Sequence, residues 1–289
     1  MATLHFLTVA EPSGCLPLTA TRALADCPLG NESLRTHQER VLGLAAGQSA
    51  LWDIHPHAWL ETSDLVAFLA QPAASVLCDA QGAELLRRRG LTGGTLGATA
   101  SYVIRFAWDM LRANEQALKT RTHWDNLGTC HASLSVEGRL AVGRGTRILP
   151  GVVVEGDVVI GENCKIGPNC YLRGSTSIGA SCHVGQAVEL KNSILLEQTN
   201  VGHLTYLGDS ILGAKVNLGA GTISSNLRHD GKPQRTLVDG VMVDTGCRKF
   251  GTIIGDGVHT GIQTGIYPGR KIWPGLTTRP GEMVSRDLR

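Results

Sequence analysis

The feature that most constrains this sequence is an aliphatic residue at every sixth position through its middle. A helix repeats every 3.6 residues and a half-buried strand every two, so neither explains a period of six. A hexapeptide period predicts a parallel β-helix, in which short strands stack coil upon coil around a narrow core. Because each coil buries its apolar edge against its neighbours, the run has to be long. The unbroken series is Val136, Val142, Ile148, Val154, Ile160, Ile166, Leu172, Ile178, Val184 and Leu190.

Composition agrees with a narrow coil interior. Aromatic residues make up only 4% of the 289 residues, whereas glycine occurs 36 times. The net charge of +2 and the lack of a Lys/Arg run argue against a nucleic-acid partner. We find no apolar stretch near the length of a membrane span and no signal-peptide pattern, so we expect a cytoplasmic protein with no membrane partner.

The eight cysteines raise the question of a metal site or a disulfide framework. Cys164, Cys170 and Cys182 occupy the small inward position of the repeat, where Thr, Val and Ile stand in other repeats. A buried Cys behaves as a small apolar residue, so we expect these three to pack in the core. The other five show no CxxC spacing, and we therefore predict no metal site and a reducing compartment.

Three regions differ in sequence texture. Residues 1–100 mix apolar runs with helical patterns at Ser33–Leu44 and Ala83–Arg89, which favours a small α/β domain. Residues 101–126 connect the domains, with an amphipathic helix expected over Tyr102–Leu118. Residues 127–289 form the predicted β-helix, so the fold class is mainly β. The apolar runs of the first region are His5 to Val9 and Ser75 to Cys78.

The repeat is interrupted where functional groups often gather in solenoids. The period slips by one residue before Leu195 and again before Leu212. The segment Ser224–Phe250 breaks it altogether, and the period returns at Ile254. An excursion of this length in a compact domain is usually functional or disordered.

Several nearly contiguous motifs lie at these interruptions: VELKNS at 188–193, GHLTYLGD at 202–209, NLGAGTI at 217–223, NLRHDGK at 226–232 and DTGCRK at 244–249. Together they resemble the acetyltransferase domain of bifunctional N-acetylglucosamine-1-phosphate uridyltransferase/glucosamine-1-phosphate acetyltransferases, in the archaeal-type branch. The resemblance covers roughly residues 100–289. It implies a left-handed β-helix, a homotrimer and acetyl-CoA as co-substrate.

By this resemblance, His203 matches the general base of the family. An acceptor amine is mostly protonated at neutral pH and must lose a proton before it attacks a thioester. Imidazole is suited to take that proton, since its ordinary pKa is about 6.5. On residue chemistry alone, His203 could equally be a surface residue between two coils.

The resemblance also implies a set of substrate-binding residues. Arg173 and Lys191 match a pair that holds the sugar phosphate, and their spacing of 18 residues is one full turn if a coil has three sides. They would then form a cationic clamp for a phosphate, rather than two solvated surface charges. Glu189, Tyr206 and Asn217 match residues that hydrogen-bond the sugar and its amine; Lys232 matches a further substrate-binding lysine, and Asn226 an acetyl-CoA contact.

The N-terminal region looks like an eroded nucleotidyltransferase domain. The segments LPLT at 16–19 and AWDMLRAN at 107–114 resemble its opening and its connection to the β-helix. The glycines that let the backbone approach a nucleotide phosphate are missing, and the region is short. We therefore expect a truncated remnant without nucleotidyltransferase activity.

These observations predict an acetyl-CoA-dependent N-acetyltransferase that acts on an amino sugar phosphate such as glucosamine 1-phosphate. One alternative is a non-catalytic scaffold or sensor that binds sugar nucleotides and derives from a bifunctional enzyme. Another is a zinc enzyme similar to β-helical carbonic anhydrases, since His183 and His203 lie about one coil apart. A catalytic zinc needs three protein ligands, and no third histidine has a convincing spacing.

Overall fold

The computed structural model describes residues 3–45 and 51–289. The chain divides into two compact units. The N-terminal unit comprises Met1–Pro12, Arg22–Cys27 and Glu32–Arg105, and the β-helix unit comprises Ser13–Thr21, Pro28–Asn31 and Phe106–Arg289. Two short N-terminal segments thus belong to the β-helix unit. No helix in the described ranges is long and apolar enough to cross a membrane.

The N-terminal unit is a small α/β fold, as predicted. Its five-stranded sheet has the order β1-β4-β7-β6-β8, and Trp52, Phe68 and Leu86 lie in its core. Its elements are β1 (Thr3–Phe6), η2 (Leu24–Asp26), β3 (Glu32–Ser33), α1 (Leu34–Ala45), β4 (Leu51–Ile54), β5 (Ala58–Trp59), α2 (Thr62–Leu69), β6 (Ala74–Cys78), β7 (Glu84–Arg88), β8 (Gly94–Gly97) and β9 (Tyr102–Val103).

Two helix predictions need correction. The segment Ala83–Arg89 is the strand β7, which pairs antiparallel with both β4 and β6 and buries Leu85 and Leu86 completely. Burial on both sides of this strand overrides the local helical pattern. The connecting helix α3 spans Ala107–Thr120 rather than beginning at Tyr102, because Tyr102 pairs with Trp59 in the two-stranded β5/β9 sheet. The Asp109 carboxylate accepts the Phe106 N–H at 2.9 Å and caps the helix start.

Buried histidines of the N-terminal unit give it a predicted sensitivity to acid. Burial lowers the pKa of His37 and of His55 to about 4. His37 stacks on Trp59 at 3.8 Å, and its Nε2 hydrogen-bonds the Leu60 carbonyl at 2.8 Å. As the pH falls, these histidines are protonated near pH 6.5 in the unfolded chain but only near pH 4 in the folded chain. The free energy of unfolding is therefore unaffected by the two rings above pH 6.5 and decreases as the pH falls from 6.5 toward 4. Each ring adds a slope approaching about 1.4 kcal/mol per pH unit in that window.

Thermal unfolding of the full chain at pH 7.5 and pH 5 tests this dependence. The wild type should lose more stability on acidification than His37→Gln, which keeps a donor for the Leu60 carbonyl but cannot titrate. Equal acid sensitivity of the two proteins would contradict a neutral, buried His37.

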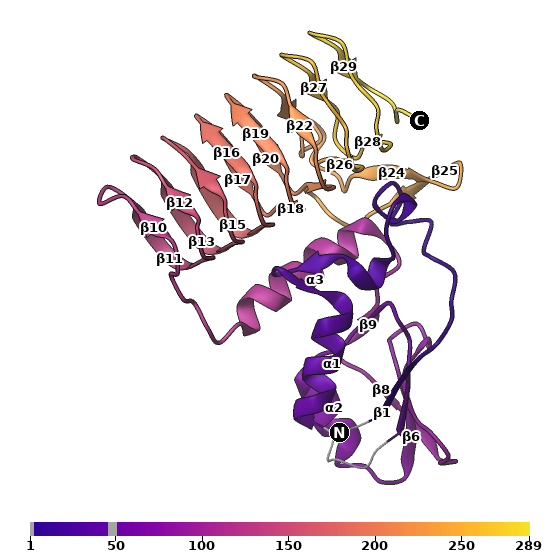
Figure 1. The fold of residues 1–289 in the computed structure, drawn as a ribbon. Helices are drawn as coiled ribbons and strands as arrows, with labels where there is room; N and C mark the ends of the chain where they lie inside the picture. The colour runs from indigo at the N-terminus through magenta and orange to yellow at the C-terminus, as the bar shows by residue number, and fades with distance from the viewer. Residues whose placement is uncertain (1–2, 46–50) are drawn as a thin grey trace. The chain divides into compact units, whose positions relative to one another are not determined.

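The β-helix unit is a column of stacked coils with three faces (Figure 1). The first face is a sheet of β10 (Thr129–Cys130), β12 (Arg147–Ile148), β14 (Lys165–Ile166), β16 (His183–Gln186), β19 (Asn200–His203) and β22 (Asn217–Leu218). The strands β11 (Ser135–Val142), β13 (Val153–Ile160) and β15 (Tyr171–Ile178) are long enough to run along both other faces. The second face continues with β17 (Glu189–Lys191), β20 (Tyr206–Gly208), β23 (Ile223–Ser224), β27 (Gly265–Ile266) and β29 (Met283–Val284). The third continues with β18 (Ile194–Leu195), β21 (Ile211–Leu212), β26 (Ile253–Ile254) and β28 (Lys271–Ile272).

The predicted mainly β fold class is confirmed: a parallel β-helix of hexapeptide repeats follows a small α/β unit. The left hand of the helix stays a prediction. The periodic residues form one continuous core, which also contains Cys164, Cys170 and Cys182 at 2–3% exposure. No disulfide links any of the eight cysteines, all of which lie in described residues. Val136 is 41% exposed, since it lies at the open end of the column.

The register slips are shortened coils. Leu172 pairs with Leu190, 18 residues on, whereas Ile178 pairs with Leu195, only 17 residues on. The excursion lies between β23 and β26 and contains the antiparallel hairpin β24 (Arg235–Val238) and β25 (Val241–Asp244). The predicted interruptions are therefore real features of the fold.

The helix α3 and the segments 13–21 and 28–31 belong to the β-helix unit. Asn114 of α3 is 1% exposed and links three pieces of chain. Its Oδ1 accepts from the Gly30 N–H at 2.8 Å and from Ser177 Oγ at 2.6 Å, while its Nδ2 donates to the Ser175 carbonyl at 3.0 Å. The Asn31 Nδ2 donates to the Ile178 carbonyl at 2.8 Å. The remaining elements are η1 (Leu18–Ala20) and β2 (Pro28–Leu29).

Candidate active site

The strands of the second face bring several predicted residues together. Arg173 on β15 is in register with Lys191 on β17, so the two cations lie one above the other, one coil apart. Glu189 is in register with Tyr206 on β20. We refer to these four residues, together with Asn192, Asp209 and Asn226, as the polar cluster.

Arg173 is paired with a carboxylate inside the cluster. Its Nε and Nη2 both donate to Glu189 Oε1, at 2.9 and 2.7 Å. This hydrogen bond raises the pKa of the Arg173 guanidinium. Both side chains are 33% exposed, so a ligand can reach them from solvent. In this arrangement Glu189 holds the guanidinium in place.

Asp209 is the residue that joins the cluster across its coils. Its carboxylate accepts from Lys191 Nζ at 3.2 and 3.3 Å, from Asn192 Nδ2 at 3.1 Å and from Asn226 Nδ2 at 2.6 Å. The Asn226 Nδ2 is also 3.2 Å from Tyr206 Oη. Burial and the charges of Asp209 and Glu189 raise the pKa of Tyr206, which keeps its phenol protonated as a donor.

The sequence interpretation assigned no role to Asp209 or Asn192. Both occupy corners with left-handed backbone, at φ 52° and 45°, a conformation that Asp and Asn tolerate better than most residues. Their spacing of 17 residues equals a shortened coil, and this equality is a signal that links them in the sequence.

A cavity of about 170 Å³ adjoins the cluster at Asn192 and Asp209. The helix α3 supplies Trp108, Arg112 and Glu115 to its wall, and the excursion supplies Cys247, Lys249 and Phe250. The Trp108 and Phe250 rings meet edge to face at 5.8 Å. Burial raises the pKa of the Cys247 thiol, so that group is neutral.

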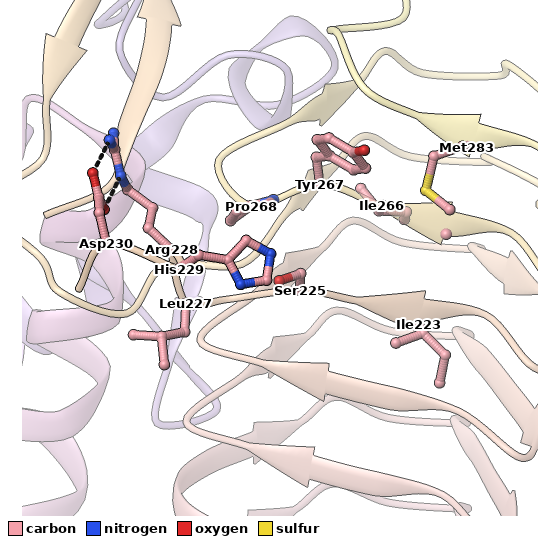
Figure 2. A pocket seen from close by; sticks show the side chains of 11 residues that line it. Ile223, Ser225, Leu227, Arg228, His229, Asp230, Ile266, Tyr267, Pro268 and Met283 are labelled. Atoms are coloured by element: carbon pink, nitrogen blue, oxygen red, sulfur yellow. Dashed lines mark hydrogen bonds and ion pairs between the residues drawn. The ribbon is translucent and has the colours of Figure 1, made fainter. Parts of the chain in front are cut away.

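A larger cavity of about 730 Å³ lies beside β23, β27 and the start of the excursion (Figure 2). Its wall includes Leu227, Tyr267 and Met283, which are 40%, 51% and 58% exposed. Figure 2 shows the His229 ring near Ser225, and the Arg228–Asp230 ion pair at one end. Asn226 lies in the chain between two residues of this wall, Ser225 and Leu227.

His203 and Asn217 lie on the first face, away from the second face that carries the cluster. His203 is the exposed last residue of β19, and Asn217 is an exposed residue of the neighbouring β22. Among the described residues, no hydrogen bond joins the side chain of either to the cluster. Only Leu204 and Thr205 separate His203 from Tyr206. Burial, Lys165 and His203 lower the pKa of His183, one coil below.

Lys232 also lies apart from the cluster. It is an exposed residue of the excursion, and its backbone N–H donates to Asp230 Oδ1 at 3.2 Å. In the described ranges no group of three or more His, Cys, Asp or Glu side chains is arranged to hold a metal ion.

Comparison with known proteins finds sequence relatives of the β-helix. The family model of the GMPPB C-terminal domain matches residues 154–267. A bifunctional sugar-1-phosphate nucleotidylyltransferase/acetyltransferase from Sulfurisphaera tokodaii is 38% identical over 181 residues, which are 63% of this chain and 45% of that protein. The bifunctional protein GlmU from Methanococcus aeolicus is 39% identical over 181 residues, 63% of this chain and 44% of that protein.

The chain thus spans less than half the length of these relatives. Among solved structures, the polysialic acid O-acetyltransferase OatWY matches 56% of this chain and 79% of that chain at 17% identity, with a TM-score of 0.28. Over its C-terminal part the chain is therefore similar to bifunctional GlmU-type sugar-1-phosphate nucleotidylyltransferase/acetyltransferases.

Proposed function

We propose that the β-helix unit transfers the acetyl group of acetyl-CoA to the amine of an amino sugar phosphate, such as a hexosamine 1-phosphate. The observation that carries this proposal is the stacking of Arg173 and Lys191 in register on one face, each held by a carboxylate. Two cations at this spacing suit a phosphate dianion, and the neighbouring Glu189 and Tyr206 suit hydroxyl and amine groups of a sugar. The activity named for the Sulfurisphaera tokodaii relative agrees with this substrate class.

His203 acts as the general base in this proposal. It ends the first face, and Tyr206 begins the second after a corner of two residues, so a sugar held by the cluster can present its amine to His203. The imidazole first takes a proton from the acceptor ammonium and passes it to solvent, and the free amine then attacks the thioester carbonyl. The imidazole accepts a second proton from this nitrogen as the amide bond forms, and it gives that proton to the CoA thiolate released when the carbon–sulfur bond breaks. Asn217, also on the first face, hydrogen-bonds the acceptor from that side.

We place the acetyl-CoA arm in the cavity of about 730 Å³, with Asn226 as its contact next to the cluster. The mostly apolar wall formed by Leu227, Tyr267 and Met283 suits a flexible thioester arm. Lys232 lies on the same excursion as this wall, and we propose that it approaches the phosphate when substrate binds.

We further propose a homotrimer in which a partner subunit covers the exposed corner at His203 and Leu204. Leu204 is 63% exposed in the single chain, and a partner that covers it would bury this apolar surface favourably. Light scattering at micromolar concentration should give three times the mass of the chain. A clean monomer that still turns over substrate would contradict a site shared between subunits.

The N-terminal unit serves structure or assembly in this proposal, as the remnant of a nucleotidyltransferase. We expect no UTP-dependent release of pyrophosphate with any sugar 1-phosphate, since the glycine-rich phosphate loop is missing from the sequence. A coupled pyrophosphate assay measures this. Pyrophosphate formation that depends on the protein would show that the unit is an active enzyme.

A non-catalytic scaffold that binds sugar nucleotides is the main alternative. The acetyltransferase and the scaffold would both bind a sugar phosphate at the polar cluster, so a binding measurement alone does not distinguish them. Release of the CoA thiol from acetyl-CoA in the presence of an amino sugar phosphate does, because only the enzyme consumes acetyl-CoA. Tight sugar-nucleotide binding without thiol release would support the scaffold.

A further inference from the structure

A lysine ends a buried and mostly apolar column on the third face of the β-helix. Ser177, Ile194, Ile211, Ile253 and Lys271 follow one another in register on successive coils. All five are at most 1% exposed. Three of them are isoleucine. Their side chains point away from the core of the β-helix, yet they are buried, so they form a second apolar layer on the third face. Lys271 is the one member with a formal charge.

The ammonium group of Lys271 has no close partner in the described part of the chain. No hydrogen bond from Nζ and no ion pair within 4.0 Å involves this residue. Asp287 lies nearby, but its Oδ1 accepts the Lys271 backbone N–H at 3.0 Å, and its Oδ2 is buried without a hydrogen bond. Burial lowers the pKa of Lys271 and raises that of Asp287. The charges of Asp287 and Asp239 favour the protonated form of Lys271, but a buried ammonium without a direct hydrogen bond is still costly, so a direct partner for it is expected.

Lys271 lines a cavity of about 200 Å³ that is separate from the polar cluster. The same wall holds a second cation, Arg289, whose guanidinium lies 4.5 Å from the centre of the Trp273 ring. It also holds Asp239, whose carboxylate accepts from Ser13 Oγ at 2.5 Å. Leu16 and Leu237 supply apolar wall.

We propose that this cavity binds a small organic anion, a carboxylate on a short apolar body, with Lys271 as its cationic partner. Arg289 is the second cation within the same wall, and Trp273, Leu16 and Leu237 contact the apolar body. Asp239 and Asp287 interact electrostatically with Lys271 and would repel a bound anion. A ligand with a single negative charge is therefore accommodated better than a phosphate dianion. The site does not depend on the acetyl transfer proposed above.

Calorimetric titration of the full chain tests the site with acetate, 4-methylpentanoate and benzoate as probes. Inorganic phosphate and the neutral 4-methylpentanamide serve as comparisons. At least one carboxylate should bind saturably and raise the melting temperature, and its affinity should fall at least tenfold in Lys271→Met. The neutral amide should bind at least tenfold more weakly than its acid.

The matched control is Lys165→Met. Lys165 stands before an isoleucine in a two-residue strand, as Lys271 does, but it is exposed. This variant should bind the carboxylate like the wild type. Without ligand, Lys271→Met should melt at a higher temperature than the wild type, because a buried charge is replaced by an apolar chain. Absence of saturable binding by all three carboxylates, equal binding by Lys271→Met, or preference for phosphate would each overturn the proposal.

Discussion

Replacing His203 with alanine should lower kcat for acetyl transfer by about 10²–10⁴-fold, the usual contribution of a positioned general base. The variant should still fold, assemble and bind acetyl-CoA, because the His203 side chain is exposed and its loss leaves no core cavity. Steady-state release of the CoA thiol, normalised to folded protein by circular dichroism, measures the change.

His183→Ala is the matched control for His203→Ala. His183 lies on the same face one coil earlier, and it has no part in the proposed chemistry. Replacing His183 should leave kcat nearly unchanged. A well-folded His203→Ala protein that keeps most of its turnover would contradict the proposed base, whatever the behaviour of His183→Ala.

The second large effect is expected from Lys191→Ala. A charge-assisted hydrogen bond is worth about 1.5–3 kcal/mol, so kcat/KM for a phosphorylated acceptor should fall by about 10- to 150-fold. Most of the loss should be in KM, because the contact to the phosphate exists before and during the reaction. An acceptor without phosphate should be affected much less.

Asp209→Asn separates direct binding of the phosphate by Lys191 from the positioning of Lys191 by Asp209. This variant keeps the shape of the side chain but removes the charge that holds Lys191 and Asn226. We expect a smaller rise in KM than for Lys191→Ala, with the preference for phosphorylated acceptors retained. If Lys191→Ala treats phosphorylated and unphosphorylated acceptors with the wild-type preference, Lys191 is only a solvated charge.

The β-helix was predictable from the sequence because the six-residue period of aliphatic residues corresponds to the inward positions of successive strands. Each inward residue meets the next coil at a fixed spacing, so the core from Val142 to Leu190 follows from the pattern alone. The strand at Glu84–Arg88 was not predictable in this way, since two neighbouring strands decide its structure. The helix α2 was also missed, and its first turn is ordered by Asp64, which accepts from four groups of residues 99–101.

The candidate site was predictable only in part. The 18-residue spacing predicted the stacking of Arg173 and Lys191. The hydrogen bonds from Asn192 and Asn226 to Asp209 cross coils of 17 residues, and that spacing could be interpreted only once the three-dimensional register was known. His203 and Asn217 were grouped with the cluster by motif, whereas the fold places them on another face. The cavities depend on the path of the excursion and of α3, and no local pattern encodes that path.

The most direct test of the central claim is the rate of CoA thiol release by the wild type with acetyl-CoA and a set of acceptors, with the product identified by mass spectrometry. The set is a hexosamine 1-phosphate, the same hexosamine without phosphate, and the N-acetylated sugar phosphate as a blocked control. We expect an N-acetylated product, with kcat/KM at least about tenfold higher for the 1-phosphate than for the free hexosamine. If neither the hexosamine 1-phosphate nor the free hexosamine releases the thiol faster than the N-acetylated control, the proposed acetyl transfer is contradicted.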